Sequence, residues 1–366
     1  MRHTADVLVI GGGIAGIGSA AQISSEASVT VLETMSAFGY HSTGRSAAIF
    51  IRNYGNATLR ALNAVSETVL LEPGDISDHS LLSPRGVMLV ATESETEALD
   101  HYLEGSVGIE SLSADQAVEL VPILRKEMIA AVAYEPRAQD IDVDRLLQGY
   151  ARIVKHNGGQ IVTNAPAQKI SRSNGVWQVE TPVGIYEAKI LINAAGGWAD
   201  EVAVMAQVNK VGLVPKRRSA ALLPAPDGHD IMKWPLFASA SEQWYAKPEG
   251  GKLMVSPADE DPVEPHDVFV DDMVLAEGLY RYEQAVNAPV TRVDKSWAGL
   301  RSFVKDQTPV VGFAPDAEDF IWVAGQGGYG IQTAPALSEY VADICLGRGP
   351  QLPEETIKAL DPGRFR

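Results

Sequence analysis

The chain has 366 residues, more than one hydrophobic core usually supports, so we expect two domains. Its formal net charge of -17 argues against nucleic acid or an anionic membrane surface as a partner. The single cysteine, Cys345, excludes an internal disulfide, a zinc cluster or an iron–sulfur cluster, and the scattered histidines indicate no metal site. We see no membrane span and no signal peptide, and we expect a cytoplasmic protein.

The chain opens with a predicted strand over residues 5–10, followed by a glycine-rich turn and a helix. The turn contains the motif G-x-G-x-x-G. The first glycine permits the tight turn, the second lets a pyrophosphate approach the backbone, and the third lets the helix pack closely on the strand. The helix would direct unpaired N–H groups at a diphosphate. The predicted contacts are Gly11, Gly13, Ile14, Ala15 and Gly16.

A second predicted strand, residues 29–32, ends at Glu33. A carboxylate at this point accepts hydrogen bonds from the ribose hydroxyls of a dinucleotide. The acid would repel the additional phosphate of NADP. The unit as a whole therefore predicts a bound FAD or NAD.

Small hydroxylated residues alternate with glycine over residues 36–48. Considered alone, this segment is as compatible with a polar surface loop as with a cofactor-binding loop. Directly downstream of the nucleotide unit, it is better explained as a cofactor-binding loop that offers hydroxyl and amide donors. The candidate contacts are His41, Ser42, Thr43, Arg45, Ser46, Ala47 and Ala48.

The middle of the chain predicts a second domain with a mixed sheet. A strand at residues 87–91 leads into it, and residues 236–240, 243–248 and 252–256 read as antiparallel strands. The acids of residues 140–144 precede a predicted helix, so capping and dipole complementarity explain them better than a metal site.

Two later segments repeat the pattern of a strand that meets small residues and a helix. The first contributes Ala195, Gly196 and Trp198, and the second contributes Gly327, Gly328, Tyr329, Gly330, Ile331 and Gln332. A chain that returns to one nucleotide fits FAD better than NAD, because a plain NAD domain is contiguous. In the second segment, a helix N-terminus near the flavin ring would stabilise its anionic reduced form.

Two arginines are candidates for binding an anionic substrate. Arg301 lies in an apolar and aromatic segment, where its guanidinium needs an anionic partner, either Asp306 or a substrate. Arg218 belongs to the basic run of residues 216–218, which also reads as a solvated basic turn.

Four motifs, G-Y-H-S-T-G-R-S-A-A, N-A-A-G-x-W, W-A-G-L-R-S-F and G-Q-G-G-Y-G-I-Q, together with the nucleotide turn, resemble the glycine oxidase and D-amino acid oxidase type of FAD flavoproteins. Within that group the chain is similar to bacterial D-arginine dehydrogenases over nearly its full length. The resemblance implies that Arg301 and Tyr245 bind the substrate carboxylate and that Arg218 faces the substrate. It also implies that Gly328 and Gln332 contact the substrate amine or the flavin. Tyr54 matches a tyrosine on a mobile lid, with a core aromatic as the alternative.

The substrate pocket departs from the arginine-specific pattern. The relative has a glutamate where this chain has Val87 and a histidine where it has Ile49, and Ile51 is expected nearby. A basic substrate side chain would lose its counter-charge, and burying an unpaired cation costs several kcal/mol. We therefore expect apolar substrate side chains to be preferred over arginine or lysine.

The predicted fold is α/β, with a Rossmann-like FAD-binding domain (residues 1–84, 140–208 and 296–366) and a mixed, largely antiparallel substrate domain (85–139 and 209–295). The expected activity is oxidative deamination of D-amino acids by hydride transfer to FAD.

Glycine, N-methyl amino acids or 2-hydroxy acids remain alternative substrates, and an electron-relaying flavin subunit is the non-enzymatic alternative. We expect FAD to be non-covalent, with His41 as the alternative attachment point. We expect the electron acceptor to be a quinone, the respiratory chain or O2, and the protein to be a monomer or a homodimer.

Overall fold

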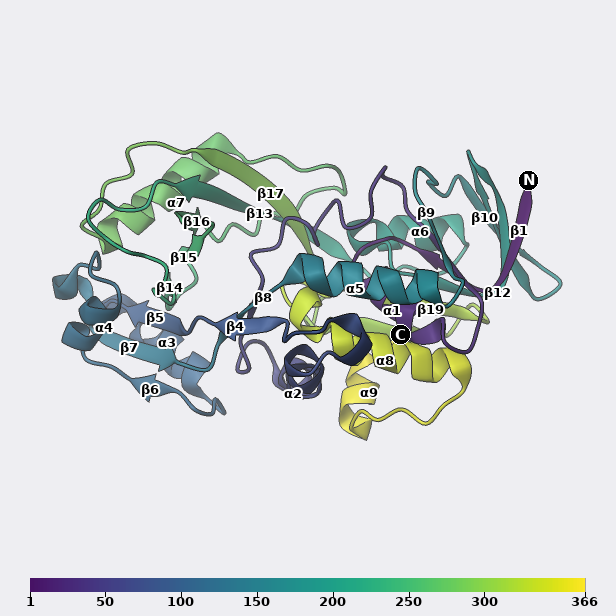
Figure 1. The fold of residues 1–366 in the computed structure, drawn as a ribbon, viewed down its shortest axis with the longest axis horizontal. Helices are drawn as coiled ribbons and strands as arrows, with labels where there is room; N and C mark the ends of the chain where they lie inside the picture. The colour runs from purple at the N-terminus through teal and green to yellow at the C-terminus, as the bar shows by residue number, and fades with distance from the viewer. Residues whose placement is uncertain (366) are drawn as a thin grey trace.

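The computed structural model describes residues 1–365 and contains two large β-sheets with a small third sheet between them. In Figure 1 the sheets lie at opposite ends of an elongated molecule, and the chain crosses between them several times. This mixed α/β architecture is the predicted fold class. Within the described residues, no helix has both the length and the apolar character needed to cross a membrane.

The first sheet has the strand order β10-β11-β12-β1-β2-β9, with β19 beside β12 and β18 beside β19. Strands β12, β1, β2, β9 and β19 are parallel, whereas β10, β11 and β18 are antiparallel to their neighbours. The bounds are β1 (Arg2–Ile10), β2 (Val29–Leu32), β9 (Gln160–Val162), β10 (Lys169–Ser173), β11 (Val176–Thr181), β12 (Gly184–Asn193), β18 (Val310–Phe313) and β19 (Phe320–Ala324).

Alternate residues of the central strands enter different cores, because successive side chains of a strand point to opposite faces. Val7 and Val9 of β1 pack on one face with helices α1, α5 and α8, and Leu8 and Ile10 pack on the other face with α6. The helices of this half are α1 (Ile14–Ile23), α2 (Ala57–Leu71), α5 (Val143–His156), α6 (Ala199–Met205), α8 (Gly330–Leu346) and α9 (Glu354–Leu360).

The second sheet has the order β17-β13-β16-β15-β14-β5-β7-β6, and only the β14–β5 pair is parallel. The predicted mixed sheet is therefore confirmed. Its strands are β5 (Val87–Ala91), β6 (Glu110–Ser111), β7 (Ala131–Glu135), β13 (Val214–Leu223), β14 (Leu236–Ser239), β15 (Tyr245–Glu249), β16 (Lys252–Ser256) and β17 (Lys295–Phe303). Its helices are α3 (Thr96–Leu103), α4 (Ala114–Leu120) and α7 (Asp272–Ala285).

Short elements complete the chain. The third sheet has the order β3-β8-β4, with β3 (Ile49–Phe50), β4 (Leu82–Pro84) and β8 (Gln139–Ile141). The 3-10 helices are Gly74–Ile76, Glu93–Glu95, Lys126–Met128, Gly196–Trp198 and Pro362–Phe365. The domain boundaries drawn from the sequence stay a prediction. Strand β17, which that division assigns to the FAD domain, pairs here with β13 of the second sheet.

The acidic residues before α5 have structural partners. Asp142 caps the helix by accepting a hydrogen bond from the Arg145 N–H, and Asp140 forms ion pairs with Arg85 and Lys247. Within the described part of the chain, no group of three or more histidine, cysteine or acidic residues could hold a metal ion. Capping accounts for Asp142, as expected, whereas the ion pairs of Asp140 were not predicted.

The turn between β1 and α1 depends on two glycines. Gly11 has a positive φ of 112°, a conformation that favours glycine. A Cβ atom on Gly16 would lie 1.9 Å from the carbonyl oxygen of Gly11. The third glycine of the motif thus allows helix α1 to pack directly on the turn.

We predict that Gly16→Ala destabilises the protein by about 1–3 kcal/mol, the usual cost of overpacking a tight contact. It should lower the melting temperature and reduce the yellow absorbance of the predicted flavin per protein. Gly349→Ala is the control, because a Cβ atom on Gly349 would meet no neighbouring atom within 4 Å. Equal melting temperatures for the two variants would contradict the packing argument.

Candidate active site

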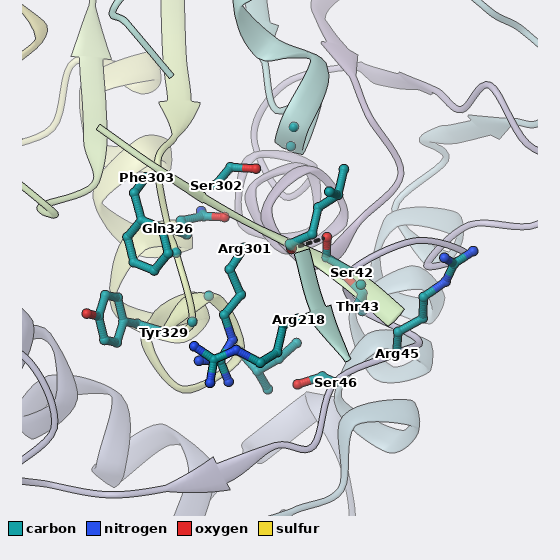
Figure 2. A pocket seen from close by; sticks show the side chains of 18 of the residues that line it. Ser42, Thr43, Arg45, Ser46, Arg218, Arg301, Ser302, Phe303, Gln326 and Tyr329 are labelled. Atoms are coloured by element: carbon teal, nitrogen blue, oxygen red, sulfur yellow. Dashed lines mark hydrogen bonds between the residues drawn. The ribbon is translucent and has the colours of Figure 1, made fainter. Parts of the chain in front are cut away.

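One cavity of about 1220 Å³ is lined by residues of both large sheets and of the loops between them. Every site residue predicted from the sequence lines it except Gly16, which packs behind the turn. The predicted cofactor-binding and substrate-binding residues therefore share a single space. Figure 2 shows part of this cavity, with Arg301, Arg218 and Tyr329 among the side chains drawn.

At the nucleotide end, the start of α1 is open to a ligand. Gly13 is the N-cap and provides no side-chain hydrogen bond to the helix, and a Cβ atom there would meet only the Thr43 hydroxyl, at 3.4 Å. The Ile14 N–H donates to the Thr43 hydroxyl at 3.0 Å. This arrangement leaves room for a diphosphate beside backbone N–H groups.

Glu33 is buried at the end of β2, as the nucleotide unit predicts. Its carboxylate oxygens accept hydrogen bonds from the N–H groups of Gly12 at 2.8 Å and Met35 at 2.7 Å. Burial raises the pKa of this carboxyl group, and the backbone N–H groups partly offset that effect. Each carboxylate oxygen has a second lone pair, so Glu33 can still accept a ribose hydroxyl.

The loop of residues 40–46 connects the two sheets. The Ser42 hydroxyl donates to the Leu300 carbonyl at 2.8 Å, and the Trp297 indole donates to the Arg45 carbonyl at 3.1 Å. The Arg45 guanidinium donates to the Ala298 carbonyl at 3.0 Å and forms an ion pair with Asp267. Arg45 thus lines the cavity, but its charge is neutralised within the protein.

At the other end, the turn before α8 contains a polar side chain that sequence reasoning missed. The Gln326 side-chain NH2 group is buried with no hydrogen-bond partner. The N-cap of α8, Tyr329, provides no side-chain hydrogen bond to the helix N–H groups. An unsatisfied donor beside an open helix start suits the polar edge of a flavin. Its place between Gly325 and Gly327 in the glycine-rich motif was the available signal.

Arg301 projects from β17 into the cavity, directly over the backbone of Gly328, where a Cβ atom would lie 3.0 Å from a guanidinium nitrogen. Within residues 1–365 it forms no ion pair. Asp306, the alternative partner, pairs with Arg364 instead. Burial alone would lower the pKa of the guanidinium, but surrounding groups raise it above its usual value. Those groups are Tyr54, Tyr245, Glu242 and Glu260.

Arg218 lies on β13, so the interpretation of residues 216–218 as a solvated turn is wrong. The side chain is 8% exposed, lines the cavity and donates to Glu260 at 2.7 Å. Its Nε group is buried without a partner. One face of Arg218 is therefore neutralised, and the other still has a donor to offer.

Aromatic residues surround the two arginines. The Tyr54 ring meets the Tyr329 ring edge-on, with centroids 5.0 Å apart. Burial raises the pKa of the Tyr54 phenol, and Arg301 opposes that effect only in part. Tyr54 is therefore protonated at neutral pH and can donate a hydrogen bond. Tyr245 lines the same cavity from the start of β15.

Gln332 lines the cavity, but both ends of its amide are bound within the protein. Its oxygen accepts from the Ile51 N–H at 3.2 Å, and its nitrogen donates to Asn63 at 2.9 Å. In this arrangement it acts on the site by holding the backbone beside Tyr54. The apolar side of the cavity consists of Ile49, Ile51, Val87, Leu236 and Ala238, which form one cluster.

Known proteins are similar to this chain in sequence and in fold. Over 95% of its length the chain is 25% identical to glycine oxidase of Bacillus licheniformis, of which the match covers 94%. It is also 25% identical to glycerol 3-phosphate dehydrogenase of Caloramator mitchellensis, over 93% of this chain and 73% of the relative. Among solved structures, glycine oxidase of Geobacillus kaustophilus has the same fold, with a TM-score of 0.84, 19% identity and 98% coverage of both chains.

The nucleotide turn, the unsatisfied donor of Gln326 and the size of the cavity together fit an FAD molecule. Residues 6–344 match the model of the FAD dependent oxidoreductase family, DAO. The chain therefore belongs to this family, and its cofactor is FAD.

Proposed function

We propose that the protein oxidises D-amino acids with neutral or hydrophobic side chains to 2-oxo acids and ammonia. The observation that carries the proposal is the Arg301 guanidinium, which faces the cavity and forms no ion pair within the described chain. A buried cation of this kind is stabilised by an anionic ligand. The carboxylate of an amino acid supplies that charge, and arginine can bind it through two parallel hydrogen bonds.

Three further groups complete the carboxylate site. Arg218 has an unused Nε donor, and the phenols of Tyr245 and Tyr54 line the same space. Tyr54 stays protonated because burial raises its pKa. Arg301, Arg218 and the two phenols can all donate to the carboxylate, and no side chain here is required to act as a base. Holding the carboxylate fixes the direction of the α-hydrogen, which is the main contribution of binding geometry to rate.

When bound, FAD would supply the hydride acceptor for the hydrogen on the substrate α-carbon, and the uncapped starts of α1 and α8 would help to hold it. The substrate amine enters neutral, and its lone pair forms the C=N bond as the hydride leaves. Loss of one amine proton gives the imino acid, and water converts it to the 2-oxo acid and ammonia. The two electrons pass on to a quinone, the respiratory chain or O2.

Side-chain selectivity follows from the apolar cluster at the opposite wall. Val87 is 3% exposed and packs with Ile49 and Ile51. A neutral or hydrophobic substrate side chain would bury apolar surface here, whereas an arginine side chain would find no acid in this cluster. Handedness rests on the resemblance to D-arginine dehydrogenases.

Two alternatives have their own support. Relatives in the comparison are named glycine oxidase, dimethylglycine dehydrogenase and sarcosine dehydrogenase, which favours small or N-methylated amino acids as a second candidate class. A 2-hydroxy acid would also satisfy Arg301. A flavin subunit that only relays electrons is the non-enzymatic alternative.

The proposal predicts that the yellow holoprotein is bleached anaerobically by D-leucine or D-phenylalanine. Bleaching by the L-enantiomers, by D-arginine and by D-2-hydroxy acids should be slower, because they lack the required handedness, apolar side chain or amine. Stopped-flow absorbance at the flavin band provides the measurement. Faster reduction by D-arginine than by D-leucine would overturn the selectivity argument, and faster reduction by sarcosine would favour the second candidate class.

Substitution of the carboxylate-binding arginine provides an independent prediction. Arg301→Lys keeps the charge but loses the two-pronged hydrogen bond, so kcat/KM should fall about 100-fold while FAD stays bound. The control is Arg217→Lys, because Arg217 on the same pair of strands is already paired with Asp259 and Asp261. Equal losses in both variants would remove the special role of Arg301.

A further inference from the structure

We propose that Glu135 is a positioning residue that fixes the Tyr54 segment, residues 51–54, in place against the carboxylate-binding groups. The inference rests on the proposed function, because it concerns how the substrate carboxylate is bound. Glu135 is not among the residues that line the cavity and would not touch the substrate. It acts through the backbone and the side chain that precede Tyr54.

Glu135 ends β7 and is only 4% exposed. One carboxylate oxygen accepts from the Arg52 N–H at 3.0 Å. The other accepts from the Asn53 side-chain amide at 2.8 Å and from the Tyr102 hydroxyl at 3.2 Å. Two of these three donors belong to residues immediately before Tyr54, so the carboxylate holds the segment from one side.

Other hydrogen bonds hold the same segment from different directions. The Asn63 amide of α2 donates to the carbonyls of Ile51 and Arg52, both at 3.4 Å, and of Tyr54 at 3.2 Å. The Asn53 amide also exchanges hydrogen bonds with the Val107 backbone, at 2.9 and 3.0 Å. These hydrogen bonds tie the segment to β7 and α2 in this structure; the mobile lid that the family resemblance implies stays a prediction.

A carboxylate is the side chain that this position requires. Its two oxygens only accept, and all three neighbouring groups donate. Within the described chain Glu135 forms no ion pair, so these charge-assisted hydrogen bonds are what stabilise its buried charge. A glutamine of equal size would turn one acceptor into a donor, which would face another N–H or O–H group.

The consequence reaches the substrate through Tyr54. Its phenol lies close enough to Arg301 for the cation to affect the phenol pKa, and its ring packs on Tyr329. If the backbone at Arg52 and Asn53 shifts, the phenol moves relative to the guanidinium. The carboxylate then loses a donor that was held in position.

The test is a double-mutant cycle in the FAD-loaded protein, with Glu135→Gln, Tyr54→Phe and the combined variant. The dissociation constant of anthranilate, a neutral amine with a carboxylate, is measured from the shift in flavin absorbance. Glu135→Gln should weaken anthranilate binding about 10-fold. The double variant should bind only as weakly as the single variant with the larger loss, because the losses in binding free energy do not add when two residues act through the same interaction.

The matched control is Glu67→Gln. Glu67 lies within 3.6 Å of the Arg52 guanidinium but accepts nothing from the backbone of the segment. It should leave anthranilate binding within about twofold, as expected for a weak ion pair. If Glu135→Gln does not yield folded holoprotein, Asn53→Ser takes its place in the cycle, because it removes the amide that Glu135 accepts from and should give the same non-additive loss.

Wild-type binding in Glu135→Gln, or a loss that simply adds to that of Tyr54→Phe, would overturn the inference while leaving the proposed function intact. A wild-type holoprotein that neither binds anthranilate nor is reduced by any amino acid would overturn the proposed function, and the inference would fail with it.

Discussion

The candidate site depends on Arg301, a cation that faces the cavity and forms no direct ion pair within the described residues. Strands β13 and β17 pair so that Arg218 lies opposite Gly299, two residues before Arg301. Glu260 neutralises Arg218, and Asp306 pairs elsewhere, so the charge of Arg301 is left for a ligand. Since leaving such a charge unpaired and buried costs several kcal/mol, we propose that an anionic ligand binds here.

The two sheets bring Arg301 and the predicted FAD-binding segments to one cavity. Helices α1 and α8 both begin at the cavity without a side-chain cap, so both N-termini are open to a cofactor bound there. Contacts from Ser42 and Arg45 to β17 then fix the second sheet against the nucleotide-binding half. The same contacts therefore position Arg301, on β17, and the loop predicted to bind the cofactor.

Local patterns in the sequence predicted the nucleotide turn, Glu33 and Arg301, because each depends on neighbouring residues with a known physical role. The role of Arg45 in joining the sheets could not be predicted, since its partner Asp267 is far away in the chain. The same is true of Glu135, whose contacts reach Arg52, Asn53 and Tyr102. The strand that carries Arg218 resembles a basic turn in the sequence, because three consecutive cations do not show the apolar–polar alternation typical of a strand. In the structure, neighbouring arginines on opposite faces of this strand each pair with an acid, Arg217 with Asp259 and Arg218 with Glu260.

The central claim is that Arg301 holds the substrate carboxylate against the flavin. A crystal structure of the FAD-loaded protein with bound anthranilate tests it most directly. The account predicts both guanidinium Nη atoms, or Nη and Nε, within hydrogen-bond distance of the carboxylate, with the amine over the flavin ring. A carboxylate bound elsewhere in the cavity, with Arg301 directed away from the ring, would contradict it.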